Sequence, residues 1–186
     1  MVNKAGNLKL DKILWIDLEM TGLSEDKDLI LEVAAIVTDW NFRELDAYEG
    51  AIKNNPILLN KRMKANSDFW DKNLENKKSF LDQNKSGKSL SVIESEIINF
   101  IDKNFDSKKP VLLGGNSIHM DRRFISKKWP KLDKKLFYRM LDVSAWKVVF
   151  EYKYNKQFTK PNNHRALDDI RGSIAELQYY LNSLKS

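Results

Sequence analysis

The sequence predicts an α/β fold, with a mixed β-sheet in which three antiparallel strands are followed by αβ units and helices cover both faces. Two observations support this prediction. Three apolar, β-prone runs precede residue 55, and the short polar connections between them favour antiparallel pairing. After them, stretches with helical spacing alternate with two more short apolar runs, an arrangement typical of αβ units.

Five runs have the composition of strands. The first, ILWIDL, is short and apolar and is broken by Thr21-Gly22, whereas turn residues follow the second, LILEVAAIVT. The fourth, VLLGG, runs into a glycine pair that permits a tight turn and a close backbone approach. The five predicted strands cover residues 13–18, 29–38, 44–53, 111–115 and 137–141.

Helices are predicted where apolar residues recur three or four positions apart. The clearest stripes run along residues 90–105 and along the final helix from Ala166 to Leu181. Asp142 is a candidate N-cap for a further helix. The other predicted segments are helix and loop from 56 to about 74, a polar loop over 83–89, and a short helix over 120–129 that Pro130 ends. The resulting order, β-β-β-α-β-α-β-α-α, matches a ribonuclease-H-like fold.

Length and composition limit the kinds of site that the chain can build. The 186 residues predict a single domain over residues 11–184, preceded by a flexible segment over residues 1–10. Because the chain has no Cys, disulfides, thiolate metal sites and a Cys nucleophile are excluded. With two His residues, a three-His zinc site is excluded as well. Carboxylates are therefore the credible metal ligands.

Charge and hydropathy leave the partner open. The 32 Lys and Arg against 26 Asp and Glu give a net charge of +6, which suits either a polyanionic partner or a solvated surface of scattered lysines. No segment reaches the roughly 18 apolar residues of a membrane-spanning helix. Residues 1–12 also lack the apolar run of a signal peptide, so a cytoplasmic location is expected.

Asp17 and Glu19 form the first candidate site. Side chains alternate along a strand, so both carboxylates point to the same face while Leu18 points to the other. Two adjacent carboxylates at the end of a buried strand repel one another unless a cation lies between them. The pair predicts either a divalent cation site or two solvated acids.

Two helix starts supply further candidates. Asp121 follows the Gly114-Gly115-Asn116-Ser117 turn and falls in the first turn of a predicted helix, where an anion is favoured in any case. His164 precedes Asp168 and Asp169 at the start of the last helix and could be a metal ligand, a proton acceptor or a surface residue. Strand ends and helix starts of α/β sheets gather at one edge, so we expect these groups to meet there. Four carboxylates can hold two divalent cations for phosphoryl transfer.

These residues together resemble a known family. The runs DLEMTGL from Asp17, GNSI from Gly115, DRRF from Asp121 and YR-x-LDVS from Tyr138 are similar to those of the oligoribonuclease family, as is the final run from His164 through Asp169 to Arg171. That family belongs to the DEDD-type 3′-to-5′ exonucleases with a His in the third motif, within the ribonuclease-H-like superfamily. The resemblance extends from about residue 13 to 181.

The resemblance implies a role for each matched residue. Asp17, Glu19, Asp121 and Asp169 match the metal carboxylates, with two Mg²⁺ or Mn²⁺ ions as cofactors, and His164 matches the general base. The His-x4-Asp spacing selects Asp169 over Asp168. The implied activity is two-metal-ion hydrolysis of short single-stranded RNA, down to dinucleotides, to 5′ mononucleotides by a homodimer.

The resemblance also implies how substrate is held. Leu23 and Trp70 match apolar caps that flank the bases, and Ser117, Arg139 and Ser144 match a pocket for the 5′ phosphate. Tyr138 matches a tyrosine that reaches the active site of the partner subunit. His119 matches no family motif, and Gly172 stands where an acidic residue is expected.

Two other functions remain open at this point. A related exonuclease that proofreads DNA or trims longer RNA would carry the same acids and His. An inactive RNA-binding relative is the second alternative, and the presence of all four carboxylates and His164 argues against it.

Overall fold

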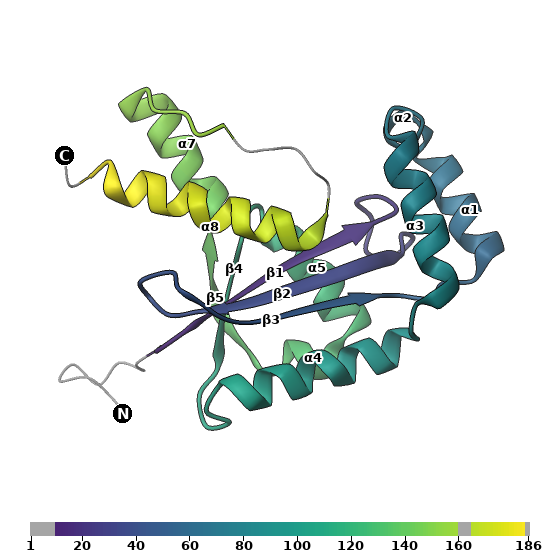
Figure 1. The fold of residues 1–186 in the computed structure, drawn as a ribbon, viewed down its shortest axis with the longest axis horizontal. Coiled ribbons are helices and arrows are strands. Elements are labelled where there is room, and N and C mark those ends of the chain that lie inside the picture. Colours follow the sequence, from purple (N-terminus) through teal and green to yellow (C-terminus); the bar gives the residue numbers. More distant parts are fainter. Residues whose placement is uncertain (1–9, 160–164, 185–186) are drawn as a thin grey trace.

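The computed structural model describes residues 10–159 and 165–184, and it contains a five-stranded mixed sheet with helices on both faces (Figure 1). The strand order is β3-β2-β1-β4-β5. The first three strands pair antiparallel, whereas β4 is parallel to β1 and to β5. The strands are β1 Ile13–Met20, β2 Ile30–Thr38, β3 Glu44–Ala51, β4 Val111–Gly115 and β5 Leu136–Asp142. The predicted fold class is confirmed.

The helices follow the strands in the predicted general order. They are α1 Pro56–Ala65, α2 Ser67–Trp70, α3 Leu74–Ser86, α4 Leu90–Asn104, α5 His119–Lys128, α6 Pro130–Asp133, α7 Val143–Tyr154 and α8 Ala166–Asn182. The predicted cap at Asp142 is confirmed, because its side chain accepts a hydrogen bond from the Ser144 backbone N–H. None of the helices in the described parts of the chain has the length and apolar character needed to cross a membrane.

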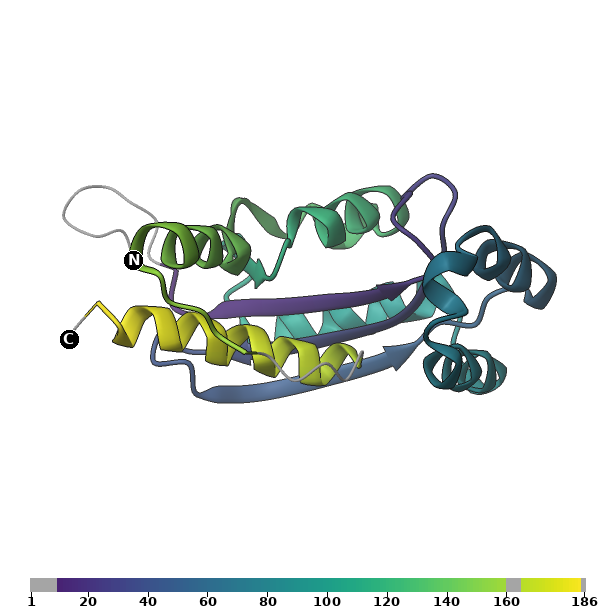
Figure 2. The same cartoon turned by 90° about the horizontal axis from the view of Figure 1, so that it is seen from above.

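Strand alternation divides the core into two layers, which Figure 2 shows on either side of the sheet. Leu14, Ile16 and Leu18 of β1 pack into the layer formed with α4, α5 and α6. Ile13 and Trp15 point the other way, into the layer formed with α7 and α8. Any odd-numbered β1 residue that follows Trp15 therefore points toward the α8 side.

A third apolar cluster joins α1, α2 and α3 to the sheet near the end of β1 (Figure 1). It contains Leu31, Leu59, Met63, Trp70 and Phe80. The prediction of a loop over residues 83–89 is wrong for its first part, since α3 continues to Ser86. The reason is that α3 buries only Phe80 and Asn84, so its sequence carries almost no apolar stripe.

Candidate active site

Asp17, Glu19 and Asp169 come together between β1 and α8. The alternation of β1 points Asp17 and Glu19 toward the α8 side of the sheet, and Asp169 lies in the first turn of α8. One carboxylate oxygen from each residue lies within 4.8 Å of the other two, and all three side chains are half-buried. Asp168 is exposed and lies outside this group.

Asp121 reaches the same strand end from the opposite layer. β1 runs past β4, since their pairing ends at Trp15 and Gly114, and this leaves the backbone of β1 beyond Trp15 without a strand partner on that side. Asp121, in the first turn of α5, accepts a hydrogen bond of 3.0 Å from the Leu18 N–H and is only 6% exposed. The N–H between the two acids of β1 is thereby satisfied by a third carboxylate.

The electrostatics of the group favour a bound cation. Burial, with added repulsion from Asp17, Asp169 and Glu32, raises the pKa of Glu19 to about 8. Burial and the charge of Asp17 likewise raise the pKa of Asp121 well above its usual range. Carboxylates that are hard to ionise together are stabilised in their charged forms when a positive ion lies between them.

The donor atoms fit hard divalent cations. All four acids offer oxygen atoms, the ligand type preferred by Mg²⁺ and Mn²⁺, and neither sulfur nor imidazole is part of the group in the described residues. The group formed by Asp17, Glu19 and Asp169, with Asp121 at the same strand end, can therefore hold a metal ion. His164, the predicted general base, lies outside the described residues.

A second polar group lies at the C-terminal ends of β4 and β5. The Ser117 N–H donates to Asp142 Oδ1 at 3.0 Å and to Ser144 Oγ at 2.8 Å, and the two serine hydroxyls lie 3.0 Å apart. Ser117 adopts a left-handed backbone conformation with φ 47°, which aims its N–H at this group. Asn116 accepts from the Ser144 hydroxyl and donates to Glu176, and it thus ties the group to α8. The structure brings the predicted pair Ser117 and Ser144 together.

Arg139 and Tyr138 lie next to each other on the edge strand β5. The Arg139 guanidinium lies 5.3 Å from the centre of the Tyr138 ring. The Tyr138 side chain is 72% exposed. Because β4 separates β5 from β1, Tyr138 projects from an edge of the sheet that is two strands away from Asp17 and Glu19.

Leu23 and Trp70, the two predicted base caps, have opposite environments. Leu23 is 71% exposed in the β1–β2 turn, whereas Trp70 is 1% exposed and packs in the α1–α3 cluster. The Trp70 indole N–H donates to the Thr21 carbonyl at 2.9 Å, so Trp70 anchors α2 to the turn that carries Leu23. The buried Trp70 ring leaves almost no surface exposed to a base in this structure. Base stacking by Trp70 stays a prediction. The His119 imidazole lies 3.5 Å from the Asp142 carboxylate, at the edge of the polar group formed by Ser117, Asp142 and Ser144.

Sequence reasoning overlooked Glu32 and Arg165. Glu32 pairs directly opposite Glu19 in the sheet and is fully buried, and Arg165 forms an ion pair with it at 2.8 Å. The available signal was the single acid in the otherwise apolar run LILEVAAIVT, because a charge within a buried strand requires a partner.

The chain is similar to known proteins over most of its length. The exonuclease family model named RNase_T matches residues 14–177. The oligoribonuclease of Francisella tularensis subsp. novicida is 41% identical over 179 residues, which cover 95% of this chain and 97% of the relative. The probable oligoribonuclease of Schizosaccharomyces pombe is 35% identical over 180 residues, which cover 95% of this chain and 69% of the relative.

Solved structures agree on the fold. A zinc-bound complex of Escherichia coli exonuclease I with single-stranded DNA superposes with a TM-score of 0.65 at 13% identity over 91% of this chain. Exonuclease I from Methylocaldum szegediense gives a TM-score of 0.64 at 13% identity over 93% of the chain. The chain spans about 40% of the length of these two proteins, so the likeness concerns the fold alone. From its sequence relatives and the exonuclease family model, the chain belongs to the oligoribonuclease family of exonucleases.

Proposed function

We propose that this protein is a metal-dependent 3′-to-5′ exoribonuclease that hydrolyses short oligoribonucleotides, down to dinucleotides, to 5′ mononucleotides. The observation that carries the proposal is the convergence of Asp17, Glu19 and Asp169 within 4.8 Å, with Asp121 bound to the same strand end. The sequence relatives named oligoribonuclease support the choice of short RNA as substrate.

The four acids and His164 have different roles in phosphodiester hydrolysis. When bound by the four acids, two divalent cations, Mg²⁺ or Mn²⁺, would supply Lewis acidity and stabilise the charge on the departing 3′ oxygen. His164 accepts a proton from the attacking water, a role suited to an imidazole with an ordinary pKa of about 6.5. The bond between phosphorus and the 3′ oxygen breaks, and the products are a 5′ mononucleotide and a chain shortened by one nucleotide.

A closed pocket for the 5′ phosphate would explain a preference for the shortest substrates. Ser117 and Ser144 offer hydroxyls 3.0 Å apart, and Arg139 adds a guanidinium that can fork onto phosphate oxygens. The exposed Leu23 side chain offers an apolar surface for a base. A substrate held by its 5′ phosphate has no room for further nucleotides on that side, so length is limited by the pocket.

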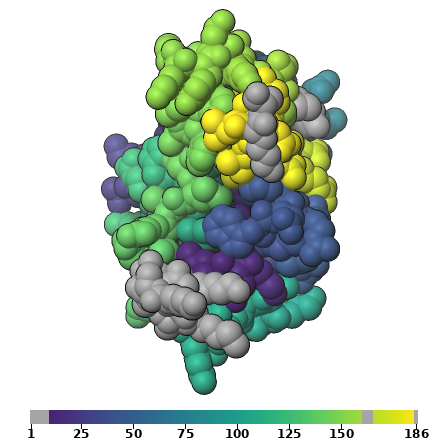
Figure 3. Space-filling model, turned by 90° about the vertical axis from the view of Figure 1, so that its left-hand side faces the viewer, coloured from purple at the N-terminus to yellow at the C-terminus, as the bar shows by residue number. Residues whose placement is uncertain are grey.

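We also propose that two copies of the chain associate through β5 and α7. β5 is an edge strand of the sheet, and Figure 3 looks at the side of the molecule on which the green segment that contains β5 and α7 lies. Open edges and apolar patches of this kind are typical of interaction surfaces. The exposed apolar and aromatic residues of β5 and α7 are Tyr138, Met140, Val148, Val149, Tyr152 and Tyr154. A second copy across this edge would bring its Tyr138 toward the acidic site.

Three substrates test the proposed activity. A 5′-phosphorylated RNA dinucleotide, a longer RNA and a single-stranded DNA are each incubated with the protein in Mg²⁺ or in EDTA. We expect the dinucleotide to have the highest kcat/KM and EDTA to abolish turnover. Asp17→Ala should lower activity by at least about 100-fold because it removes a metal carboxylate.

Two results would contradict the proposal. Faster turnover of the longer RNA or of the DNA would favour an exonuclease for longer substrates, and full activity of Asp17→Ala would rule out the metal site. Asp82→Ala is the matched control, because Asp82 is an exposed acid of α3 that forms an ion pair with Lys85. We expect this variant to keep the activity of the unmodified protein.

A further inference from the structure

Glu32 is a buried carboxylate whose two oxygens are both engaged by groups outside the acidic cluster. It lies on β2 directly opposite Glu19, and its side chain is 0% exposed. Oε2 accepts hydrogen bonds from Gln83 of α3 at 2.6 Å and from Arg165 at 2.8 Å. Oε1 accepts from the Ala166 N–H at 3.3 Å. These contacts connect Glu32 to α3 and to the start of α8.

The contact with Ala166 makes Glu32 the cap of α8. The N-cap residue, Arg165, provides no side-chain hydrogen bond to the first turn of this helix. Instead a carboxylate from a neighbouring strand satisfies one of the N–H groups and places a negative charge at the positive end of the helix. The position of the α8 start is therefore coupled to the middle of the sheet.

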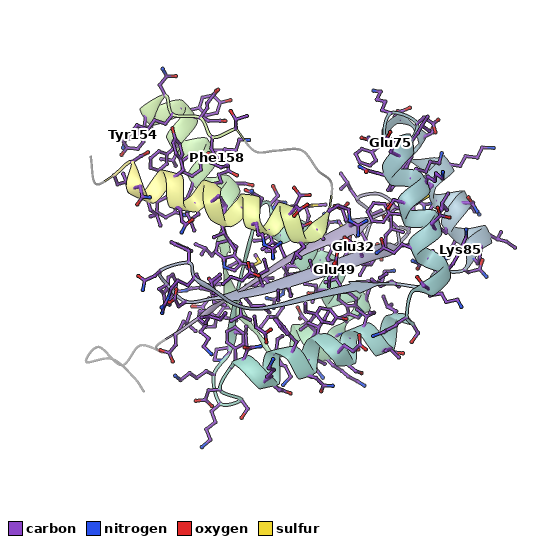
Figure 4. The ribbon with its side chains drawn as sticks, in the orientation of Figure 1. Glu32, Glu49, Glu75, Lys85, Tyr154 and Phe158 are labelled. Carbon is purple, nitrogen blue, oxygen red and sulfur yellow. The ribbon has the colours of Figure 1, made fainter. Side chains whose placement is uncertain are left out.

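Arg165 strengthens this coupling through its side chain. Its guanidinium pairs with Glu32 at 2.8 Å and lies 3.5 Å from Glu49 on β3, and Figure 4 shows these two acids side by side near the α8 start. It also donates to Ser79 of α3 at 3.3 Å and lies 5.9 Å from the Phe80 ring centre. The Arg165 backbone carbonyl in turn accepts the Asp169 N–H at 2.9 Å. One residue thus connects β2, β3 and α3 to the turn that carries Asp169.

We propose that Glu32 and Arg165 are positioning residues that hold Asp169 against β1, so that the metal affinity of the acidic cluster depends on a pair that touches no metal. Asp169 is the member of the Asp17, Glu19 and Asp169 group that does not belong to β1, and like charges push it away from the strand. The inference rests on the proposed function, since it concerns the metal site of that activity.

The positive charge of Arg165 has a second effect at the site. Glu32 lies opposite Glu19, and without a partner it would add a fourth negative charge to the strand end. The Arg165 guanidinium pairs with Glu32 at 2.8 Å and offsets that charge. Its loss would therefore weaken both the placement of Asp169 and the charge balance around Glu19.

Metal binding without nucleic acid tests this role. Mn²⁺ alone is titrated into the purified protein, and its dissociation constant is measured by calorimetry and by the rise in Tm. We expect Arg165→Ala and Glu32→Gln to weaken Mn²⁺ binding by about 10-fold or more, as loss of groups that orient metal ligands generally does. Activity on a dinucleotide should recover largely at saturating Mn²⁺, and Arg165→Lys should lie between Arg165→Ala and the unmodified protein.

Two further variants serve as a control and as an independent test. Arg171→Ala is the matched control, because Arg171 lies on the same helix but pairs with Glu44 on the exposed side, and its Mn²⁺ affinity should stay unchanged. Gln83→Ala removes one donor to Glu32 without altering α8, and it should weaken Mn²⁺ binding even if Arg165→Ala fails to fold.

The possible failures are distinguishable. If Arg165→Ala, Glu32→Gln and Gln83→Ala lower the Tm in EDTA but bind Mn²⁺ as tightly as the unmodified protein, the pair is only structural and the inference is overturned. If the unmodified protein itself binds no Mn²⁺ and cleaves no RNA, the proposed function fails instead.

Discussion

At the scale of single residues, the active site depends on carboxylates that are costly to keep charged. Glu19 and Asp121 both have raised pKa values because burial and the charge of Asp17 act on each. A cation would offset this cost, so metal binding and the ionisation of these acids are linked. Each acid therefore destabilises the metal-free protein and stabilises the metal-bound one.

Glu19→Gln tests this linkage through pH. The folded-state pKa of about 8 lies above the ordinary 4.5, so the stability that protonated Glu19 contributes is fully present below pH 4.5 and is lost as pH rises through 8. Gln imitates the protonated acid. Thermal unfolding is measured in EDTA between pH 5 and 9. At the alkaline end, the free energy of unfolding of Glu19→Gln should exceed that of the unmodified protein by on the order of 3 kcal/mol.

Bound metal should reverse the order of stability of Glu19→Gln and the unmodified protein. In saturating Mn²⁺ the unmodified protein should be the more stable of the two, because its charged Glu19 binds the ion. A constant difference between the two proteins across the pH range in EDTA would show that Glu19 titrates as an ordinary surface acid.

At the scale of elements, residues of α1 and α2 stabilise the turn between β1 and β2 through hydrogen bonds. Asp28 is 2% exposed and accepts hydrogen bonds from Thr21, the Ser24 N–H, Arg62 and Asn66. Burial raises the pKa of Asp28, but these hydrogen bonds outweigh it and hold the pKa below its usual value. A Cβ on Gly22 would approach Asn66 Nδ2 to 2.5 Å, so the turn closes tightly over this network.

Arg62→Ala should loosen the turn that carries Leu23. It leaves the buried Asp28 charge without its cationic partner, at a cost of about 3–5 kcal/mol in the free energy of unfolding. The KM for a dinucleotide should rise while kcat changes little, since the acids of β1 are untouched. Chemical denaturation and steady-state kinetics measure the two effects.

An exposed pair provides the comparison for Arg62. Arg43→Ala breaks the Asp39 ion pair in the β2–β3 turn, where the Arg43 side chain is 76% exposed, and it should cost less than about 1 kcal/mol. An equal loss of stability in the two variants, or an unchanged KM in Arg62→Ala, would contradict the role given to the Asp28 network.

The sequence predicted those parts of the fold that have a strong local pattern. The β1 alternation was sufficient to place Asp17 and Glu19 on one face, and apolar stripes identified α4 and α8. α3 was overlooked because it is held by the single cluster around Trp70 and Phe80 rather than by a stripe. Whether Trp70 is buried depends on the packing of three helices, which no spacing in the chain encodes.

At the scale of the whole molecule, the charge of +6 does not identify the substrate. Many lysines are already paired with acids on the surface, as Lys127 is with Asp26 and Lys135 with Asp102, and the site itself is acidic. A dinucleotide offers few phosphates, so counterion release from a basic surface would add little affinity. In the proposed function, specificity comes instead from the phosphate pocket and from the surface of a second copy.

Mixed dimers test whether that surface comes from a second copy. Tyr138 is 72% exposed on an edge strand and lies two strands from β1, so in the proposed dimer it serves the partner's acids. Tyr138→Ala should remain dimeric by sedimentation but lose most activity on a dinucleotide. Mixing it with inactive Asp17→Ala should restore part of the activity, because one hybrid site then combines intact acids with an intact tyrosine. Exchange of subunits is verified by labelling the two variants differently, and hybrid dimers without recovered activity would exclude this role for Tyr138.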